Sequence, residues 1–333
     1  MFEGLTIYHP RYFLPPKIGG YFHPRLMYPA AKRAADRLRG EGFDFDVIDA
    51  HFVYPNGVVA ALLGERYGVP VVMTGRGEDM LRFPDMPFKG RRIRTALRRA
   101  GHCIALTTEI AEAMKRHGAA DEKVAVIPNG VDTALFRPLP QRYCREVLGL
   151  PIDAPIILSI GDRLKLKGFH LLVDALPRIL EAHPHAILAI VGGPGRHGQD
   201  YTAEIVRRVE NYNLQDRVLM AGHRPHRELP LWHNSADLFA LLSSREGSPN
   251  VLLEALACGR PAIGTSVGGI LDELSNADCG SLLLERTAAA AATTIIERLN
   301  AGCHQTLTRS PMEHRHWNAT AVALMDSAFR LDS

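Results

Sequence analysis

Residues 238–264 read LFALLSSREGSPNVLLEALACGRPAIG. The apolar run at 238–242 has the length of a buried strand, and the loop after it carries Ser248 and Pro249, which suit the N-cap and first position of a helix. That helix reaches Leu256 and ends at Gly259, and a second apolar run follows at 261–264. Strand, loop, helix and strand in this order predict a βαβ unit and a parallel sheet.

Two carboxylates stand in this stretch. Glu246 lies in the loop at the carboxyl end of a predicted strand, and Glu254 lies about a turn and a half into the helix. Ligands bind open α/β sheets at this edge, and a helix N-terminus there attracts anions. Carboxylates accept hydrogen bonds from hydroxyls, so the pattern predicts a ligand with two hydroxyl-rich rings joined by phosphates, such as a nucleotide sugar. The simpler alternative is a glutamate that favours the helix dipole and a second with ordinary helical partners.

The same alternation of short apolar runs and amphipathic segments extends along the chain. Besides the two strands above, it predicts strands at 47–48, 69–73, 102–106, 124–127, 156–160, 187–191 and 218–220. We therefore expect an α/β protein with two Rossmann-like parallel-sheet domains. A proline-rich stretch suggests a linker from about 133, which divides a first domain at 1–150 from a second at 151–310. Residues 311–333 are expected to form a C-terminal helix that returns toward the first domain.

Composition excludes several classes of protein. The 333 residues are 46% hydrophobic with a formal charge of +3, which does not predict nucleic-acid binding. Five scattered cysteines lack metal-ligand spacing, so we expect reduced thiols. The sequence has no 18-residue apolar run and no signal-peptide core near its start, which predicts a cytoplasmic protein. The DFD at 44–46 imitates a metal-binding DxD but precedes a strand, so we expect no metal and no cofactor.

Two further strand-to-helix turns carry glycines or cations. The segment GDRLKLKGF, after the strand at 156–160, brings Arg163 and Lys167 to a turn that suits a diphosphate, although a solvated basic loop is the alternative. The segment GGPGRHG matches GxGxxG through Gly193 and Gly195. It is not at the first βα turn of its domain, and the next strand ends in Ala-Gly-His rather than an acid, so we do not predict a dinucleotide. A turn where backbone approaches a ligand remains the interpretation.

Together these segments resemble the retaining GT-B glycosyltransferases of family 4. The resemblance rests on Glu-x7-Glu at Glu246 and Glu254, and on VGGPG, HNSADLFALLSSREG, VAVIPNGVDTALFRP and DVIDAHFVYPNGVVAALL, over roughly 45–329. The chain also resembles the branch acting in bacterial polysaccharide or teichuronic acid synthesis. It implies two domains facing a cleft and a hexosyltransferase that moves a sugar from a nucleotide-diphosphate donor to an acceptor hydroxyl with retention of configuration.

The resemblance also implies roles for single residues. Glu246, the catalytic residue, would hold the donor sugar, Glu254 the ribose hydroxyls and Lys167 the diphosphate. The family often has arginine directly after the glycine of that turn, where this chain has Asp162, so the part of Arg163 is less direct. The implied donor-binding set is Arg163, Lys167, Gly193, Gly195, Glu246, Gly247, Ser248, Asn250 and Glu254. His51 and Arg76 would contact the cleft from the first domain.

The first domain departs from the family pattern. Family members have a strand, a glycine-rich loop, a helix and a second strand before the strand of DVIDAH, but only 45 residues precede that segment here. We therefore expect a first domain shortened at its N-terminus by about two strand–helix units. The alternative function is accordingly a truncated, non-catalytic nucleotide-sugar-binding protein. A sugar-nucleotide epimerase of the same fold would need acid/base carboxylates and a cleft histidine, which the sequence does not identify.

The remaining expectations concern partners. Residues 89–99 carry six cations on a predicted helix, which suits anionic lipid headgroups at about 1 kcal/mol for each cation near the surface. A solvated helix face is the alternative. The acceptor would be a sugar or a lipid-linked molecule, with peripheral contact at the inner membrane face and a homo-oligomer compatible with the sequence.

Overall fold

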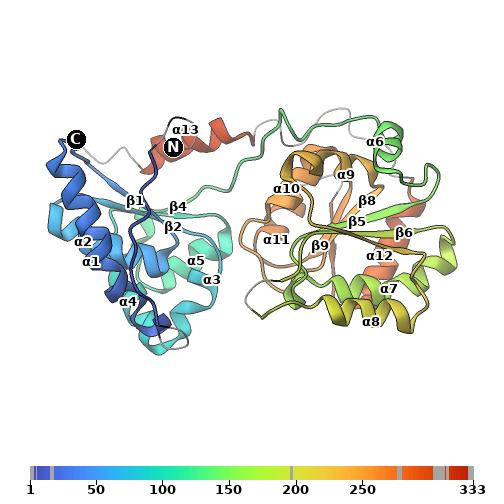
Figure 1. Ribbon diagram of the computed structural model, residues 1–333, viewed down its shortest axis with the longest axis horizontal. Helices are drawn as coiled ribbons and strands as arrows, with labels where there is room; N and C mark the ends of the chain where they lie inside the picture. The colour runs from blue at the N-terminus through green and yellow to red at the C-terminus, as the bar shows by residue number, and fades with distance from the viewer. Residues whose placement is uncertain are drawn as a thin grey trace. The chain divides into compact units, whose positions relative to one another are not determined.

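The computed structural model describes residues 4, 6–15, 19–195, 198–275, 280–302, 312 and 315–328. The chain forms two compact units (Figure 1). One comprises Met1–Pro128 with Val322–Ser333, and the other comprises Asn129–Ala321. Each unit has its own parallel sheet, as the alternation of strands and helices predicts.

The sheet of the first unit runs in the order β1-β2-β3-β4, and every pair is parallel. Its strands are β1 (Ile48–His51), β2 (Val71–Gly75), β3 (His102–Ala105) and β4 (Val124–Val126). The helices that follow or precede them are α1 (Gly19–Gly40), α2 (Val58–Tyr67), α3 (Glu78–Leu81), α4 (Pro87–Arg99) and α5 (Thr108–Arg116). β2 is buried along its whole length because parallel strands are covered on both faces.

The C-terminal helix α13 (Trp317–Ala328) supplies one of those covers. Its Leu324 packs against Val72, Ile104 and Ile127, on the face opposite the main core of α2, α4 and α5. The hydroxyl of Ser327 lies 3.2 Å from Nε2 of His102. Residues from Val322 onward therefore belong to the first unit, although they close the chain.

The sheet of the second unit runs in the order β10-β9-β8-β5-β6-β7, again all parallel. Its strands are β5 (Ile156–Ile160), β6 (Ile187–Val191), β7 (Val218–Gly222), β8 (Leu238–Leu241), β9 (Ala262–Thr265) and β10 (Gly280–Leu283). Its helices are α6 (Gln141–Leu148), α7 (Phe169–Ala182), α8 (Thr202–Asn211), α9 (Leu229–Ser235), α10 (Asn250–Ala257), α11 (Gly268–Leu274) and α12 (Ala288–Asn300). The direction of winding reverses at β5, which pairs with β6 on one side and β8 on the other.

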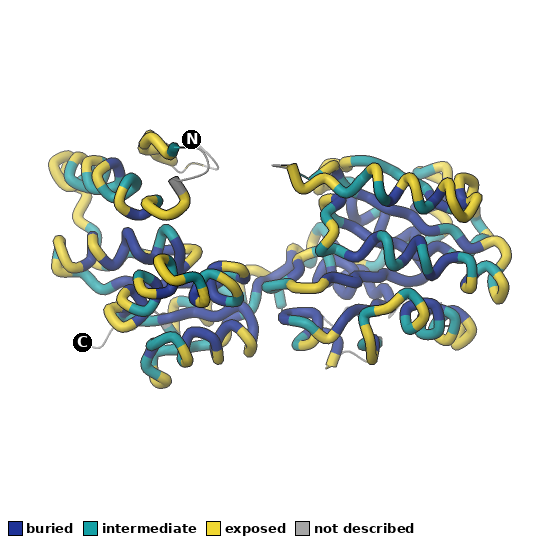
Figure 2. Tube along the Cα trace, turned by 90° about the horizontal axis from the view of Figure 1, so that it is seen from below, coloured by how far each residue is buried: buried dark blue, intermediate teal, exposed yellow. Residues whose placement is uncertain are grey.

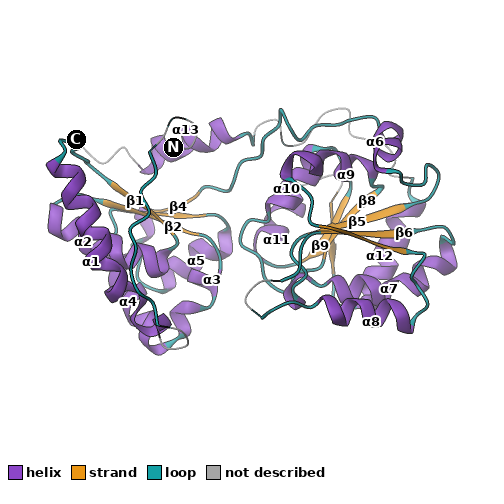
Figure 3. Ribbon diagram, in the orientation of Figure 1, coloured by secondary structure: helices purple, strands orange, loops and turns teal. Residues whose placement is uncertain are grey.

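Helices cover both faces of this second sheet. α9, α10 and α11 lie on one face, and α7, α8 and α12 lie on the other (Figure 3). The buried positions follow the strands and the inward sides of these helices (Figure 2). The sheet order places the loops after β5 and β8 side by side at the carboxyl edge, which is the topological switch point where α/β sheets bind ligands.

The structure divides the chain earlier than the sequence predicts. The expected boundary lies at 150, whereas the second unit begins at Asn129. Residues in the expected linker form α6, whose Cys144 is buried, and Phe136 and Leu150 pack in the core of the second unit. Polar bonds hold α6 as well, since Nη2 of Arg145 lies 2.7 Å from Oδ2 of Asp237 and both side chains are buried. The prolines therefore mark a packed segment rather than a free linker.

Three cysteines lie in the described part of the chain as buried free thiols. Burial raises the pKa of Cys103 and Cys258 to about 12, so neither thiol is reactive near neutral pH. Cys279 and Cys303 lie outside the described residues. Within the described residues, no helix is both long and apolar enough to span a membrane.

Candidate functional site

The centre of the site is an ion pair at the switch point of the second sheet. Lys167 ends the short turn after β5, and Glu246 lies in the loop after β8. The Nζ of Lys167 is 2.7 Å from Oε1 of Glu246, and the hydroxyl of Ser243 donates to the same oxygen at 2.5 Å. The structure thus brings together two residues that the sequence assigned to one ligand, 79 positions apart.

This ion pair is partly buried but still open to a ligand. The side chain of Lys167 is 20% exposed and that of Glu246 is 11% exposed. Charges in such a position interact more strongly than on an open surface because little water screens them. The pair therefore offers one cation and one carboxylate to a ligand that carries both negative charge and hydroxyls.

Glycines at the start of α11 fix the loop that carries Glu246. Gly268 has φ +46°, and a Cβ at that position would lie 2.0 Å from the carbonyl oxygen of Glu246. The amide of Gly269 donates to the carbonyl of Gly247 at 2.7 Å. Only a residue without a side chain permits so close a contact between the two backbones. The position of Glu246 thus depends on residues more than 20 positions further along the chain.

The start of α10 lies beside this loop. The sequence predicts Ser248 as the N-cap, but Pro249 occupies that position and the helix begins at Asn250. The hydroxyl of Ser248 is buried and has no hydrogen-bond partner among the described residues. Asn250 is held in place because its Oδ1 accepts from Asn129 Nδ2 at 2.8 Å. A buried hydroxyl without a partner, next to a helix N-terminus that no side chain caps, is a ready partner for an anionic or hydroxylated ligand.

Glu254 lies deeper in α10 and is 5% exposed. Its Oε1 is 3.0 Å from Nε2 of His226, whose side chain is 62% exposed, and its Oε2 is 3.6 Å from Nε2 of the fully buried His233. Phe136 packs edge-on against both imidazoles. Burial by itself raises the pKa of Glu254, but the two histidines outweigh it and hold that pKa below its usual value. The carboxylate is therefore ionised and ready to accept hydrogen bonds from hydroxyls.

The other residues predicted in this unit lie less centrally. Gly193 borders the carboxyl edge near Asp162 and His223. Gly195 instead faces the next loop, where its amide donates to Oδ1 of Asp200 at 3.2 Å. Arg163 is buried, and its guanidinium donates to the carbonyl of Gly192 at 2.6 Å and to Thr202 at 2.7 Å. Its bonds tie the loop after β6 to α8 rather than leaving the cation free for a phosphate.

His51 and Arg76 lie at the carboxyl ends of β1 and β2 in the first unit. The Nη1 of Arg76 is 3.2 Å from Nδ1 of His51, and Nε2 of His51 is 3.3 Å from Oδ2 of Asp49. The buried Asp79 joins the two loops, because its carboxylate accepts from the amides of Val53 at 2.7 Å and Gly77 at 2.8 Å. Burial raises the pKa of Asp79, while the backbone hydrogen bonds act in the opposite direction. The structure therefore fixes an imidazole and a guanidinium at one sheet edge.

The basic helix α4 has one buried face, formed by Gly90, Ile93, Ala96 and Leu97. Part of its charge is used within the protein. The Nζ of Lys89 lies 3.8 Å from the centre of the Phe83 ring, Arg92 donates to the carbonyl of Tyr21, and Arg99 pairs with Glu65 at 2.7 Å. Fewer cations remain available to an outside partner than the sequence count suggests.

Sequence reasoning missed His226, His233 and Ser243. His233 and Ser243 belong to HNSADLFALLSSREG, which was recognised for its overall resemblance rather than for its polar side chains, and His226 lies outside the recognised segments. A histidine next to a buried apolar run is more often a core residue than a ligand-binding residue. The sequence therefore holds no specific signal that these side chains contact Glu246 or Glu254. Among the described residues, no cluster of three or more His, Cys, Asp or Glu side chains has the arrangement of a metal site.

Two sequence families match the chain. The family described as Glycosyl transferases group 1 matches residues 141–310, and the family described as Glycosyltransferase Family 4 matches residues 3–135. The first match contains the Lys167–Glu246 pair and Glu254, and the second contains His51 and Arg76. Each match falls mainly within one of the two units.

Curated relatives resemble the chain over most of its length. A D-inositol 3-phosphate glycosyltransferase of Acidothermus cellulolyticus is 29% identical over 314 residues, which cover 90% of this chain and 70% of the relative. A protein of the same name from Kineococcus radiotolerans is 30% identical over 308 residues, which cover 85% of this chain and 71% of the relative.

Solved structures show the same fold. Anabaena HepE in complex with UDP aligns with a TM-score of 0.71 at 24% identity, over 89% of this chain and 78% of HepE. The sucrose-phosphate synthase of Thermosynechococcus elongatus aligns with a TM-score of 0.76 at 22% identity, over 96% of this chain and 80% of the synthase. Further structures of HepE contain UDP with glucose and UDP-glucose.

Proposed function

This chain belongs to the group 1 glycosyl transferases and is a glycosyltransferase of the GT-B fold, and we propose that it transfers a hexose from a nucleotide-diphosphate sugar to an acceptor hydroxyl. The observation that carries the proposal is the Lys167–Glu246 ion pair at the switch point of the second sheet. Relatives named as glycosyltransferases and the UDP complexes of HepE support a nucleotide-sugar donor.

The diphosphate of the donor would compete with Glu246 for Lys167. The lysine can exchange one anionic partner for another, so its charge stays neutralised throughout binding. Once released, the carboxylate of Glu246 keeps its hydrogen bond from Ser243 and gains capacity to accept hydrogen bonds from the hydroxyls of the donor sugar. The same two residues thus act first as partners of each other and then as partners of two parts of the donor.

The nucleoside would lie along α10. The buried carboxylate of Glu254 accepts hydrogen bonds from the ribose hydroxyls. Because Nε2 of the exposed His226 contacts one oxygen of that carboxylate, the His226 side chain moves away when the ribose binds. The backbone of Gly247 and Asn250 and the unpartnered hydroxyl of Ser248 face the phosphates. Arg163 is left out of this donor set because its guanidinium already binds protein groups.

Transfer proceeds with retention of configuration. The bond between the anomeric carbon and the diphosphate oxygen breaks, the acceptor oxygen bonds to that carbon on the same face, and the acceptor proton passes to the leaving diphosphate. Lys167 and the N-terminus of α10 stabilise the charge that builds on the diphosphate, while Glu246 orients the sugar. No enzyme nucleophile, metal or cofactor takes part in this proposal.

The acceptor is a sugar or a lipid-linked molecule in polysaccharide or glycolipid synthesis. His51 and Arg76 would contact donor or acceptor from the first unit. The cations of α4 that lack internal partners would provide a weak peripheral contact with an anionic membrane on the cytoplasmic side, at about 1 kcal/mol for each cation near the surface. Vesicle sedimentation with and without anionic lipid measures that contact.

A donor screen tests the function. UDP-, GDP- and ADP-sugars are titrated by calorimetry, and release of the nucleotide is followed with and without hydroxyl acceptors. We expect one nucleotide to bind, and Lys167→Met to weaken its binding about tenfold or more because a charge-assisted hydrogen bond is lost. Lys115→Met is the matched control, since Lys115 forms an ion pair with Glu112 on α5 in the other unit.

Each outcome has a distinct meaning. If no nucleotide binds, or Lys167→Met and Lys115→Met behave alike, the assignment of the site is wrong. If a nucleotide sugar binds but is neither hydrolysed nor transferred to any acceptor, the alternative of a non-catalytic nucleotide-sugar-binding protein replaces the enzyme.

A further inference from the structure

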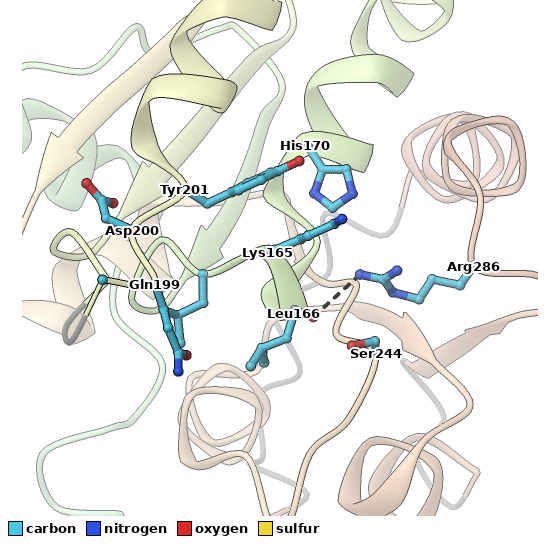
Figure 4. A pocket seen from close by; sticks show the side chains of 10 residues that line it. Lys165, Leu166, His170, Gln199, Asp200, Tyr201, Ser244 and Arg286 are labelled. Atoms are coloured by element: carbon cyan, nitrogen blue, oxygen red, sulfur yellow. Dashed lines mark hydrogen bonds between the residues drawn. The ribbon is translucent and has the colours of Figure 1, made fainter. Parts of the chain in front are cut away.

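A cavity of about 510 Å³ lies in the second unit beside the loops that carry Lys167 and Glu246, but none of the residues proposed to bind the donor lines it. Its walls come from the turn after β5, the first turn of α7, the loop before α8, and the residues after β8 and β10. The volume is within the range that holds a small metabolite. Figure 4 shows the side chains that line it.

Three basic side chains point into this cavity from different elements. Lys165, His170 and Arg286 direct their nitrogens toward a common space (Figure 4). Among the described residues, neither Lys165 nor Arg286 forms an ion pair with a carboxylate. Arg286 is oriented by backbone carbonyls, because it donates to Leu242 at 2.9 Å and to Leu166 at 3.4 Å. One positive charge held by backbone carbonyls and a second on an exposed lysine therefore line the same cavity without a carboxylate partner among the described residues.

The positive charges around the cavity affect the protonation of His170. Its Nδ1 is buried and has no hydrogen-bond partner within the described part of the chain. Burial lowers the pKa of His170, and the charges of Arg286, Arg208 and Lys165 lower it further, while Asp174 acts in the opposite direction. Arg208 and Asp174 neutralise each other through two hydrogen bonds of 2.7 and 2.6 Å. The positive potential that remains comes from Lys165 and Arg286, and an anion in the cavity would relieve it.

The rest of the lining suits hydroxyl groups. Tyr201 packs edge-on against the ring of His170, and Ser244 and Gln199 also line the cavity. Asp200 is the carboxylate of this lining, and it is held at the rim because its Oδ1 accepts from Gly195 and Thr202. A ligand with a phosphate at one end and hydroxyls at the other matches a basic side and a polar side.

We propose that this cavity binds a small phosphorylated sugar, with the phosphate between Lys165, His170 and Arg286 and the hydroxyls toward Gln199 and Asp200. The site is separate from the proposed donor site, since Lys167 and Glu246 bind each other and neither lines the cavity. The proposal does not depend on the identity of the donor.

Calorimetry in phosphate-free buffer tests the site with glucose 6-phosphate, inorganic phosphate and glucose as probes. Glucose 6-phosphate is expected to bind in the presence of saturating UDP, and more tightly than either inorganic phosphate or glucose. Lys165→Gln removes a charge from an exposed side chain and should weaken glucose 6-phosphate binding about tenfold or more. Arg178→Gln is the matched control, because Arg178 is exposed on α7 and does not line the cavity.

A nuclear magnetic resonance titration of His170 gives a second readout that does not rely on a variant. Bound phosphate should raise the pKa of His170, because a negative charge then faces the imidazole together with Lys165, Arg286 and Asp174. The proposal is overturned if Lys165→Gln and Arg178→Gln bind glucose 6-phosphate alike, if UDP displaces it, or if free phosphate binds as tightly as the sugar phosphate. Failure of UDP, GDP and ADP alike to bind contradicts the donor proposal, whereas the binding of glucose 6-phosphate can still be measured without them.

Discussion

The two units use the same parallel architecture but differ in the order of their strands. The first sheet is wound in one direction, β1-β2-β3-β4, whereas the second reverses at β5 and continues on its other side with β8. Reversal leaves two neighbouring strands whose following helices diverge to opposite faces, so their loops are free to hold a ligand. In the second unit those loops carry Lys167 and Glu246, and the described first sheet has no equivalent point.

The difference suggests a division of labour. The second unit has a buried carboxylate, an ion pair and a helix N-terminus at one edge of its sheet. These groups would together bind the donor. The first unit offers His51 and Arg76, which are more exposed and hold each other through one contact. Donor affinity should therefore respond to changes in the second unit and hardly at all to changes in the first.

The largest expected effect is on transfer. Glu246→Gln keeps the size of the side chain but removes the negative charge that accepts hydrogen bonds from the donor sugar. The rate of transfer should therefore fall about 100-fold or more. Steady-state rates with the donor found by screening measure it. Arg76→Gln in the first unit is the comparison, and its effect on nucleotide affinity in calorimetry should be small. A loss of nucleotide affinity in Arg76→Gln as large as that in Lys167→Met would remove the proposed division between the units.

The next largest effect is on stability, and it tests whether α6, which precedes β5, is part of the second unit. Asp237 accepts from Arg145 of α6 and from the amide of Ile156 at 2.6 Å, all in the interior. Asp237→Ala leaves the arginine charge buried without this carboxylate, so the free energy of unfolding should fall by about 3–5 kcal/mol.

Glu146→Ala is the control for that measurement, because the Arg142–Glu146 pair on the same helix is exposed. It should cost less than about 1 kcal/mol in urea unfolding. Similar losses in the two variants would mean that α6 behaves as a linker after all.

A smaller effect concerns the loop of Glu246. Gly268→Ala introduces a Cβ 2.0 Å from the carbonyl of Glu246 at a positive φ. We expect a loss of about 2–3 kcal/mol in the free energy of unfolding together with weaker donor binding, because the loop must shift. Gly302→Ala is the matched control, since φ is +60° there but nothing lies within 4 Å. It should cost about 1 kcal/mol from strain alone and leave donor binding unchanged.

The smallest effect depends on pH. Burial lowers the pKa of His233 below its ordinary value of 6.5 in the folded protein. The unfolded chain then binds more protons than the folded chain as pH falls below about 6.5, so stability is complete above that pH and is lost below it. The loss is at most about 1.4 kcal/mol for each pH unit, the value for one proton.

His233→Phe should flatten this dependence between pH 7.5 and 5.5 in thermal unfolding. Phenylalanine fits the site because His233 already packs against Phe136 and Phe239. His185→Asn, at an exposed position, should leave the dependence as it is. A dependence that His233→Phe does not change would assign the titration to other groups.

Much of the fold was predictable from local patterns. The runs at 156–160 and 187–191 are β5 and β6 to the residue, because each is an almost entirely apolar segment that follows a proline-containing turn and ends at a glycine. The strand β10 (Gly280–Leu283) was not predicted, since GSLL has neither the length nor the β-branched residues of a strand signal. The proline-rich linker was predicted too long, because prolines indicate a local backbone preference and not the packing of Phe136 and Leu150 in the core of the second unit.

The sequence by itself determined the chemistry at the sheet edge. It placed Glu246 and Glu254 before and within one helix and Lys167 after a neighbouring strand, since spacing and element type are local properties. Only the tertiary structure decided which of these groups meet. The strand order brings Lys167 to Glu246, packing encloses Glu254 between His226 and His233, and internal hydrogen bonds occupy the guanidinium of Arg163. Such contacts join residues tens of positions apart, and no periodicity along the chain encodes them.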